Sequence, residues 1–243
     1  MENKIADSIP RSRVYLTDNL KYMKLCKDGE FDIGIVDPEY RDDNEPTEHM
    51  RKKTGMKNWY GTPKEKYFEQ LFRITKHQII FGGNYFTDIL DFREFKKSGD
   101  IQDVKPFLEA NNNWFLWNKG FTDGKNMNWS MCEMAWVSIR KNVKLFKLIP
   151  SGKCYDWHPT SKPKQIYDYL FNTYCQEGWK ILDTNLGSGT SREVAYHSKL
   201  NLDFTGLELN KDYFNKSIDA FHKSIDLGAF GEKPKNQEQF KLF

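Results

Sequence analysis

The sequence predicts an α/β fold in which helices cover both faces of a mostly parallel sheet. Short apolar runs that end at a charged or glycine-rich turn alternate along the 243 residues with longer segments of helical periodicity. The runs are rich in isoleucine, valine, leucine and aromatic residues, which suits buried strands. No internal repeat or long linker interrupts the pattern, so we expect one domain over residues 1–230 and a flexible tail over residues 231–243.

Seven segments have the composition and the flanking turns of strands. They cover residues 13–17, 31–36, 77–81, 113–117, 134–139, 180–182 and 203–207. The second segment is followed at once by Asp37, the sixth by Asp183 and the seventh by Glu208. Ligands of open α/β sheets bind beyond the carboxyl ends of the strands, so these acidic residues mark the edge where a site is expected.

Helix signals lie between the strands. Thr62, Pro63 and Glu65 have the spacing of a capping threonine, a first-turn proline and a capping-box glutamate. Further helices are predicted over residues 88–109, 161–175, 190–200 and from 210 to 228, the last with apolar residues spaced four, three and four apart.

Composition excludes several classes of protein. Lysine and arginine number 37 and aspartate and glutamate 34, a net charge of +3, which excludes a polycation but allows a local basic face. No apolar run approaches the roughly 20 residues of a membrane span, and the first residues have no apolar signal core, so we expect a cytoplasmic protein. The four cysteines have no paired spacing, and neither a disulfide framework nor a bound metal is expected.

A glycine-rich turn joins the sixth strand to the helix that follows it. Gly187 and Gly189 allow a ligand to approach the backbone, and the helix offers unpaired N–H groups. Glu208 ends the next strand at the spacing of an acidic residue that binds ribose hydroxyls. Position 192 is arginine rather than the third glycine of a dinucleotide site, so S-adenosylmethionine fits better. The alternative is a tight strand–helix turn with a surface glutamate.

The motif Asp37-Pro38-Glu39-Tyr40 follows the second strand. With it, the chain resembles the DNA amino-methyltransferases, which methylate adenine-N6 or cytosine-N4. The matching stretches are VDPEY (36–40), IIFGGNYF (79–86), WFLWNKG (114–120), CEMAWVS (132–138), WHPTSKP (157–163), ILDTNLGSGTS (181–191) and FTGLELNKDYF (204–214). The catalytic stretch precedes the cofactor loop, as in the permuted β-type order, and the resemblance covers about residues 13–225.

The resemblance implies a Rossmann-like, S-adenosylmethionine-dependent methyltransferase fold with a seven-stranded sheet and a role for each matching residue. Asp37, Pro38 and Tyr40 would hold the target base. The residues implied in cofactor binding are Asp183, Gly187, Ser188, Gly189 and Thr190 for the methionine part, Glu208 for the ribose, Asp18 for the adenine, and Thr160 and Lys162 for the opposite side of the pocket.

The chemistry explains the residues of the catalytic motif. An exocyclic amino group is a poor nucleophile, and Asp37 with the carbonyl of Pro38 could accept its two hydrogens and stabilise the developing charge. The base must leave the duplex stack, and Tyr40 would stack on it, which contributes about 1–3 kcal/mol. Methylation at carbon 5 of cytosine needs a cysteine nucleophile, usually after proline, and no cysteine here follows a proline.

Adenine-N6 is the favoured target because the motif begins with aspartate, whereas serine more often accompanies cytosine-N4. Two positions depart from the family pattern, since Glu39 replaces a second proline and Asn185 replaces phenylalanine. Three alternatives stay open. They are cytosine-N4 methylation, a catalytically weakened protein that binds DNA or cofactor, and methylation of RNA or of a protein glutamine.

Basic residues interleaved with aromatics in the loop 41–61 suit a nucleic-acid backbone and a displaced base, although a solvated loop has the same composition. The predicted DNA-binding residues are Arg41, Arg51, Lys52, Lys53 and Lys57. Only residues 141–156 occupy the usual place of a target-recognition segment, so recognition would be permissive or come from this loop, from residues 87–112 or from a second subunit in a homodimer. The tail sequence QFKLF, Gln239 to Phe243, resembles a peptide that docks on the replication sliding clamp, or else folds back onto the domain.

Overall fold

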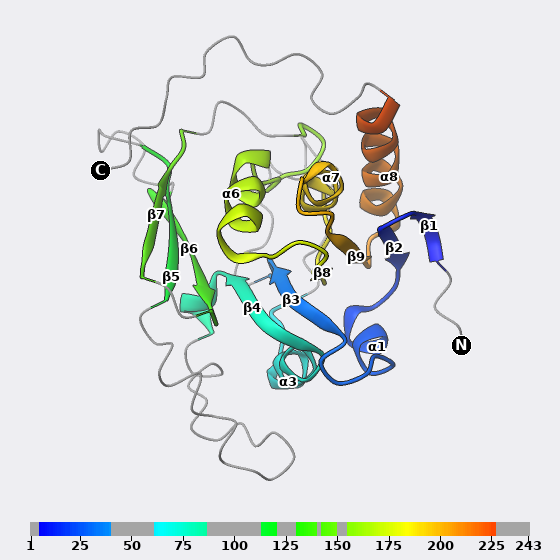
Figure 1. The fold of residues 1–243 in the computed structure, drawn as a ribbon, viewed down its shortest axis with the longest axis horizontal. Helices are drawn as coiled ribbons and strands as arrows, with labels where there is room; N and C mark the ends of the chain where they lie inside the picture. The colour runs from blue at the N-terminus through cyan, green and yellow to red at the C-terminus, as the bar shows by residue number, and fades with distance from the viewer. Residues whose placement is uncertain are drawn as a thin grey trace.

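A computed structural model describes residues 5–39, 61–86, 113–120, 130–139, 142–149 and 155–226. The described residues form a nine-stranded sheet with helices on both faces (Figure 1). The strands are β1 (Ile5–Ile9), β2 (Ser12–Leu16), β3 (Phe31–Val36), β4 (Thr75–Phe81), β5 (Trp114–Asn118), β6 (Cys132–Val137), β7 (Lys144–Lys147), β8 (Lys180–Asp183) and β9 (Asp203–Glu208). The helices are α1 (Asn19–Met23), α3 (Glu65–Ile74), the short 3-10 helix η1 (Gly83–Tyr85), α6 (Lys164–Tyr174), α7 (Thr190–His197) and α8 (Lys211–Asp226).

The strand order is β1-β2-β9-β8-β3-β4-β6-β5-β7. Pairing is parallel from β2 through β9, β8 and β3 to β4, and again between β5 and β7, while β1–β2, β4–β6 and β6–β5 are antiparallel. The mostly parallel sheet is therefore confirmed. The seven predicted strands occupy the seven central positions, but the expected number of seven is too small, because β1 and β7 add one strand at each edge.

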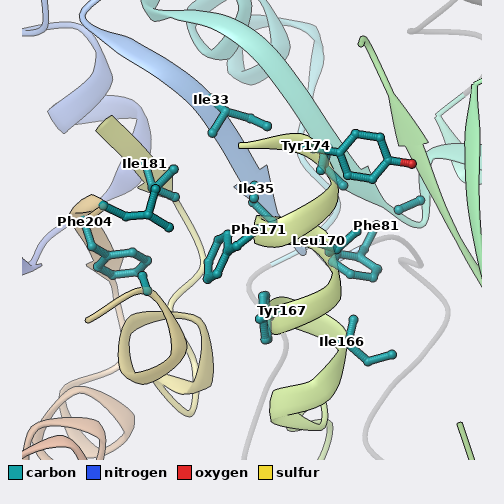
Figure 2. Close-up of a cluster of buried hydrophobic side chains, with 14 of the residues drawn as sticks. Ile33, Ile35, Phe81, Ile166, Tyr167, Leu170, Phe171, Tyr174, Ile181 and Phe204 are labelled. Atoms are coloured by element: carbon teal, nitrogen blue, oxygen red, sulfur yellow. The ribbon is translucent and has the colours of Figure 1, made fainter. Parts of the chain in front are cut away.

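Side chains alternate between the two faces of the central strands, and each face is covered by helices. Ile33, Ile35 and Ile181 belong to the cluster under α6, α7 and α8, whereas their neighbours Val36 and Leu182 belong to the cluster under α1 and α3. This period of two inside continuous apolar runs is typical of a sheet buried on both sides. Figure 2 shows the first cluster, in which the apolar side chains of α6 pack against β3, β4 and β8.

Two helix starts can be compared with the sequence prediction. Asn210, where the last helix was predicted to begin, caps α8, since its side-chain oxygen accepts hydrogen bonds from the backbone N–H of Asp212 (2.9 Å) and Tyr213 (3.2 Å). The predicted Thr62 cap is wrong. Helix α3 begins at Glu65, and Lys64 occupies the capping position without a side-chain hydrogen bond. Glu65 instead lies in the first turn, where its charge favours the positive end of the helix dipole.

The N-terminal hairpin of β1 and β2 is joined to the other end of the chain by a buried cation. Arg192 of α7 is fully buried, and its guanidinium pairs with Asp7, donates to the Ser12 hydroxyl (2.8 Å) and lies over the Phe221 ring. The second oxygen of Asp7 contacts His222 of α8 at 3.0 Å. These contacts keep the hairpin on the edge of β9, the strand with which β2 pairs.

The predicted helix over 88–109, most of the loop 41–61 and the tail 231–243 lie outside the described residues. None of the helices that the structure describes is long and apolar enough to cross a membrane.

The packing of α6 on the sheet predicts a large effect of truncating its central leucine. Leu170 is fully buried, whereas Leu145 of β7 is 65% exposed. We expect Leu170→Ala to lower the free energy of unfolding by about 2–5 kcal/mol, because it leaves a cavity. The matched Leu145→Ala should change it by less than about 0.5 kcal/mol. Urea denaturation of both variants measures the difference, and equal effects would contradict this description of the core.

Candidate active site

The carboxyl ends of four neighbouring parallel strands bring acidic residues to one edge of the sheet. Asp37 follows β3, Asp183 ends β8 and Glu208 ends β9. Asp18 follows β2 by one turn residue, and the backbone N–H of Thr17 donates to the carbonyl of Glu208 at 2.8 Å. The edge predicted from the strand endings is therefore present, and it unites residues far apart in the sequence.

Two glycines shape the loop between β8 and α7. Gly187 has φ of 55° and Gly189 has φ of 76°, in the left-handed region that side chains disfavour. A Cβ atom on Gly187 would also lie 2.8 Å from Nε2 of His158, and one on Gly189 would lie 3.0 Å from Cβ of Ser217. Close packing and backbone conformation therefore both require glycine, as the predicted cofactor loop does.

Glu208 fixes this loop through its carboxylate. Oε2 accepts the backbone N–H of Gly187 at 2.7 Å, and Oε1 accepts that of Asn210 at 2.7 Å. Burial raises the pKa of Glu208, and these backbone hydrogen bonds oppose the rise. A carboxylate has about four lone-pair positions, so it can still accept hydroxyl groups of a ribose.

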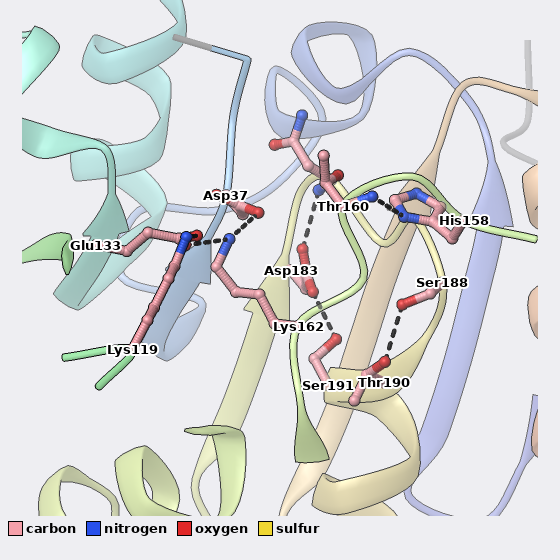
Figure 3. Close-up of polar contacts among 11 residues, drawn as sticks. Asp37, Lys119, Glu133, His158, Thr160, Lys162, Asp183, Ser188, Thr190 and Ser191 are labelled. Carbon is pink, nitrogen blue, oxygen red and sulfur yellow. Dashed lines mark hydrogen bonds and ion pairs between the residues drawn. The ribbon is translucent and has the colours of Figure 1, made fainter. Parts of the chain in front are cut away.

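Asp183 braces the same loop from within. Its carboxylate accepts the Ser191 hydroxyl (2.6 Å) and the backbone N–H of Asn185 (3.0 Å). Burial raises the pKa of Asp183 to about 6, although both hydrogen bonds favour the ionised form. Ser188 and Thr190 join their hydroxyls at 2.8 Å in the next turn (Figure 3).

Asn185, which replaces the phenylalanine of the family pattern, is held by hydrogen bonds. Its side-chain oxygen accepts the Thr184 hydroxyl at 2.7 Å. The Thr184 hydroxyl in turn lies 2.5 Å from the phenolic oxygen of Tyr67 on α3. The departure at position 185 is thus accommodated by a polar contact rather than by ring packing.

The other predicted cofactor residues lie at the rim of the loop. Asp18 caps α1, and one of its oxygens accepts the backbone N–H of Lys21 at 2.8 Å. Thr160 is exposed, and its backbone N–H lies 3.4 Å from Nδ1 of His158. His158 itself packs against Tyr213, with ring centroids 4.7 Å apart, which supports a structural part for this histidine.

Asp37 receives the ammonium group of Lys162, which sequence reasoning placed in the cofactor pocket. Oδ2 of Asp37 accepts a charge-assisted hydrogen bond from Nζ, and Nζ also lies 4.4 Å from the centre of the Phe81 ring. Oδ1 is buried and accepts no hydrogen bond from the described residues. Burial raises the pKa of Asp37, and the Lys162 ammonium opposes that rise. Pro38, the next residue, is buried.

Glu133 and Lys119 complete this polar group and were missed from the sequence. Lys119 Nζ lies 2.7 Å from Oε1 of Glu133, and Lys162 Nζ lies 3.5 Å from Oε2. The two ammonium groups lower the pKa of Glu133 against the effect of burial. Both residues lie in quoted family stretches, WFLWNKG and CEMAWVS, and the pairing of β5 with β6 brings them together. That antiparallel register was the signal that could have found them.

Tyr40, the five predicted DNA-binding residues and the clamp-like peptide lie outside the described residues and stay predictions. Within the described ranges, no cluster of three or more histidine, cysteine or acidic side chains could hold a metal ion.

Comparison with known proteins gives sequence matches to Type II methyltransferases, although no family model matches the chain. M.HpaI of Haemophilus parainfluenzae is 39% identical over 56 residues, which is 23% of this chain and 17% of that protein. M2.DpnII of Streptococcus pneumoniae is 33% identical over 96 residues, 39% of this chain and 30% of that protein. M2.LlaDCHI of Lactococcus lactis subsp. cremoris is 31% identical over 111 residues, 45% of this chain and 36% of that protein. The matches span about a third or less of these curated relatives.

Solved structures match over most of the chain. M1.HpyAVI bound to S-adenosylmethionine has a TM-score of 0.53 at 21% identity, covering 85% of this chain and 98% of that one. TTHA0409 of Thermus thermophilus, complexed with S-adenosyl-L-methionine, has a TM-score of 0.57 at 12% identity, covering 89% and 96%. The cytosine-N4-specific PvuII DNA methyltransferase has a TM-score of 0.51 at 12% identity, covering 92% and 95%.

The fold is therefore the Rossmann-like fold of S-adenosylmethionine-dependent methyltransferases, as predicted. The sequence matches support the resemblance to DNA amino-methyltransferases.

The Gly187 geometry predicts that alanine is costly for two separable reasons. Gly29 has a similar φ of 61°, but a Cβ there meets no described atom within 4 Å. We expect Gly29→Ala to cost about 1–2 kcal/mol of unfolding free energy from backbone strain alone. Gly187→Ala should cost clearly more, because the new methyl group must displace the His158 ring. Chemical denaturation compares the two, and an equal loss would show that the contact with His158 is unimportant.

Proposed function

We propose that the protein transfers a methyl group from S-adenosylmethionine to the exocyclic amino group of a DNA base. The observation that carries this proposal is Oδ1 of Asp37, a buried acceptor with no hydrogen bond from the described residues. Leaving such an oxygen unpaired costs about 1–3 kcal/mol, so its persistence suits a donor that arrives with the substrate. The amino group of a flipped base is such a donor.

The residues around the loop fit the cofactor. Gly187 and Gly189 give the loop its left-handed backbone conformation, and Glu208 and Asp18 each retain acceptor capacity for hydroxyl or amino groups. The carboxylates of Asp37, Asp183 and Glu208 give the edge a negative character that favours a cation. When bound, S-adenosylmethionine would supply a methyl group whose bond to the positively charged sulfur breaks as the new C–N bond forms, leaving a neutral thioether.

Asp37 can prepare the amino group for attack. Lys162 holds Oδ2, so Oδ1 keeps a fixed direction in which it can accept an N–H of the base. This hydrogen bond, with one to the Pro38 carbonyl, localises the nitrogen lone pair that forms the new C–N bond. The nitrogen then carries one proton too many, and the Asp37 carboxylate is placed to accept it before releasing it to solvent.

The adenine-N6 position is the target we propose, because the catalytic motif begins with Asp37. A cytosine-N4-specific enzyme is among the structural neighbours, so cytosine is the second candidate. The protein should be incubated with DNA and labelled S-adenosylmethionine, with RNA and a glutamine peptide in parallel, and the methylated product identified. N6-methyladenine supports the proposal, and N4-methylcytosine favours the second candidate. Label only in RNA or peptide, or cofactor binding without transfer, would refute it.

Removing the Asp37 carboxylate should abolish transfer but not cofactor binding. We expect Asp37→Ala to lower the methylation rate by at least about 10²–10³-fold, the usual loss when one preorganised polar group is removed. Its affinity for S-adenosylmethionine, measured by calorimetry, should stay within a few-fold of the wild-type value. Asp219→Ala, an exposed aspartate on α8, is the matched control and should change neither quantity. Full activity of Asp37→Ala would overturn the catalytic assignment.

Removing the Glu208 carboxylate, in contrast, should weaken the binding of S-adenosylmethionine. Glu208→Ala releases the Gly187 N–H and removes the proposed ribose acceptor, and hydrogen bonds to charged groups contribute about 1.5–3 kcal/mol. We therefore expect cofactor affinity to fall by about tenfold or more. Glu69→Ala, an exposed glutamate on α3, serves as control. Unchanged affinity of Glu208→Ala would place the cofactor elsewhere.

A further inference from the structure

On the basis of the proposed function, we propose that Glu133 and Lys119 are positioning residues that act on the catalytic carboxylate of Asp37 through Lys162. Neither touches the reacting atoms in this arrangement. They set how strongly the Lys162 ammonium group interacts with the Asp37 carboxylate.

The four groups form one series of alternating charge (Figure 3). Lys119 pairs with Glu133 at 2.7 Å, Glu133 lies 3.5 Å from Lys162, and Lys162 contacts Asp37. They come from four places in the chain, namely the turns after β5 and β3, strand β6 and the segment before α6. Two carboxylates and two ammonium groups make the series neutral as a whole. Removing the charge of any one member therefore leaves a net charge on the other three.

Burial makes this balance consequential. The side chains of Lys162 and Lys119 are 5% and 13% exposed, and those of Asp37 and Glu133 are 22% and 23% exposed. Ion pairs at this depth are screened much less than surface pairs, and removing one partner leaves an uncompensated buried charge. The Lys162 ammonium group is therefore attracted by two carboxylates, those of Asp37 and Glu133. The charge of Lys119 neutralises part of the charge of Glu133 and so weakens the attraction of Glu133 for Lys162.

The other groups facing Asp37 do not replace Lys162. Tyr67 of α3 and Tyr167 of α6 have pKa values raised by burial and stay neutral at ordinary pH. Asp183 of β8 adds a carboxylate, which disfavours a second negative charge at Asp37. Among the described residues that face Asp37, Lys162 is thus the cation that favours its ionised form.

Opposite consequences follow for the two ends of the series. Glu133→Gln leaves Lys162 to Asp37 alone, so Asp37 should stay ionised to lower pH. Lys119→Met leaves the charge of Glu133 uncompensated, so Lys162 is drawn toward Glu133 and Asp37 should protonate at higher pH. If Asp37 must be ionised for transfer, the acid limb of the rate profile follows its pKa in both cases.

The test is the pH dependence of the methylation rate in the full chain. The acid limb is expected to move to lower pH in Glu133→Gln and to higher pH in Lys119→Met. Lys119→Arg, which keeps the positive charge, should leave the acid limb of the pH–rate profile at its wild-type position. In the Glu133→Gln background the shift caused by Lys119→Met should vanish, because the carboxylate through which it acts is gone. A limb that stays fixed, or moves the same way in both single variants, overturns the inference.

A readout besides activity separates this inference from the proposed function. Carbon-13 NMR of the Asp37 side-chain carboxyl, assigned with Asp37→Asn, follows its titration directly in each variant. Titration midpoints that move in opposite directions support the charge series even if no variant, wild type included, methylates DNA, which would refute only the proposed function. Methylation with unmoved midpoints refutes the series and leaves the proposed function standing.

Discussion

The parallel pairing of β3, β8, β9 and β2 is the constraint on which the site depends. It fixes the carboxyl ends of these strands at one edge, where Asp37, Asp183 and Glu208 gather. The register is held by apolar side chains on both faces, because a slip of one residue would turn each of them from one cluster to the other. The core and the site are therefore set by the same hydrogen-bonded ladder.

Gathering acids at a buried edge is unfavourable, and the structure offsets it differently at each position. Glu208 accepts backbone N–H groups, Asp183 accepts a hydroxyl and a backbone N–H, and Asp37 receives an ammonium group. The oxygens of Glu208 and Asp183 accept hydrogen bonds from groups of the loop between β8 and α7 and the residues next to it. These two carboxylates therefore also fix the shape of that loop. Asp37 differs because one of its oxygens stays without such a bond from the described residues. Asp37, the least satisfied of the three carboxylates, is the one that we propose accepts the amino group of the base.

Local sequence patterns predicted the central strands, the acidic edge and the glycine loop because each is encoded in one short segment. The edge strands escaped prediction for a physical reason. β7 (Lys144–Lys147) has only two apolar residues between two lysines instead of a buried apolar run, and the apolar residues of β1 (Ile5–Ile9) are interrupted by Asp7 and Ser8. The Lys162–Asp37 contact joins segments 125 residues apart in the sequence. The Glu133–Lys119 pair depends on the register of β5 on β6, which no local spacing encodes. The Thr62 cap was predicted wrongly although its local capping pattern is intact, because the helix begins three residues later, at Glu65.

The place of the N-terminal hairpin has a consequence for how the chain reaches its native state. β2 pairs with β9, and Arg192 and His222 hold β1 and β2 from helices that flank that strand. During synthesis the ladder between β2 and β9 cannot close until β9, which lies far along the chain from β2, has been made. Contacts of such long sequence separation slow folding and leave strand edges uncovered in the meantime. Completion of the sheet thus waits for the segment that carries β9.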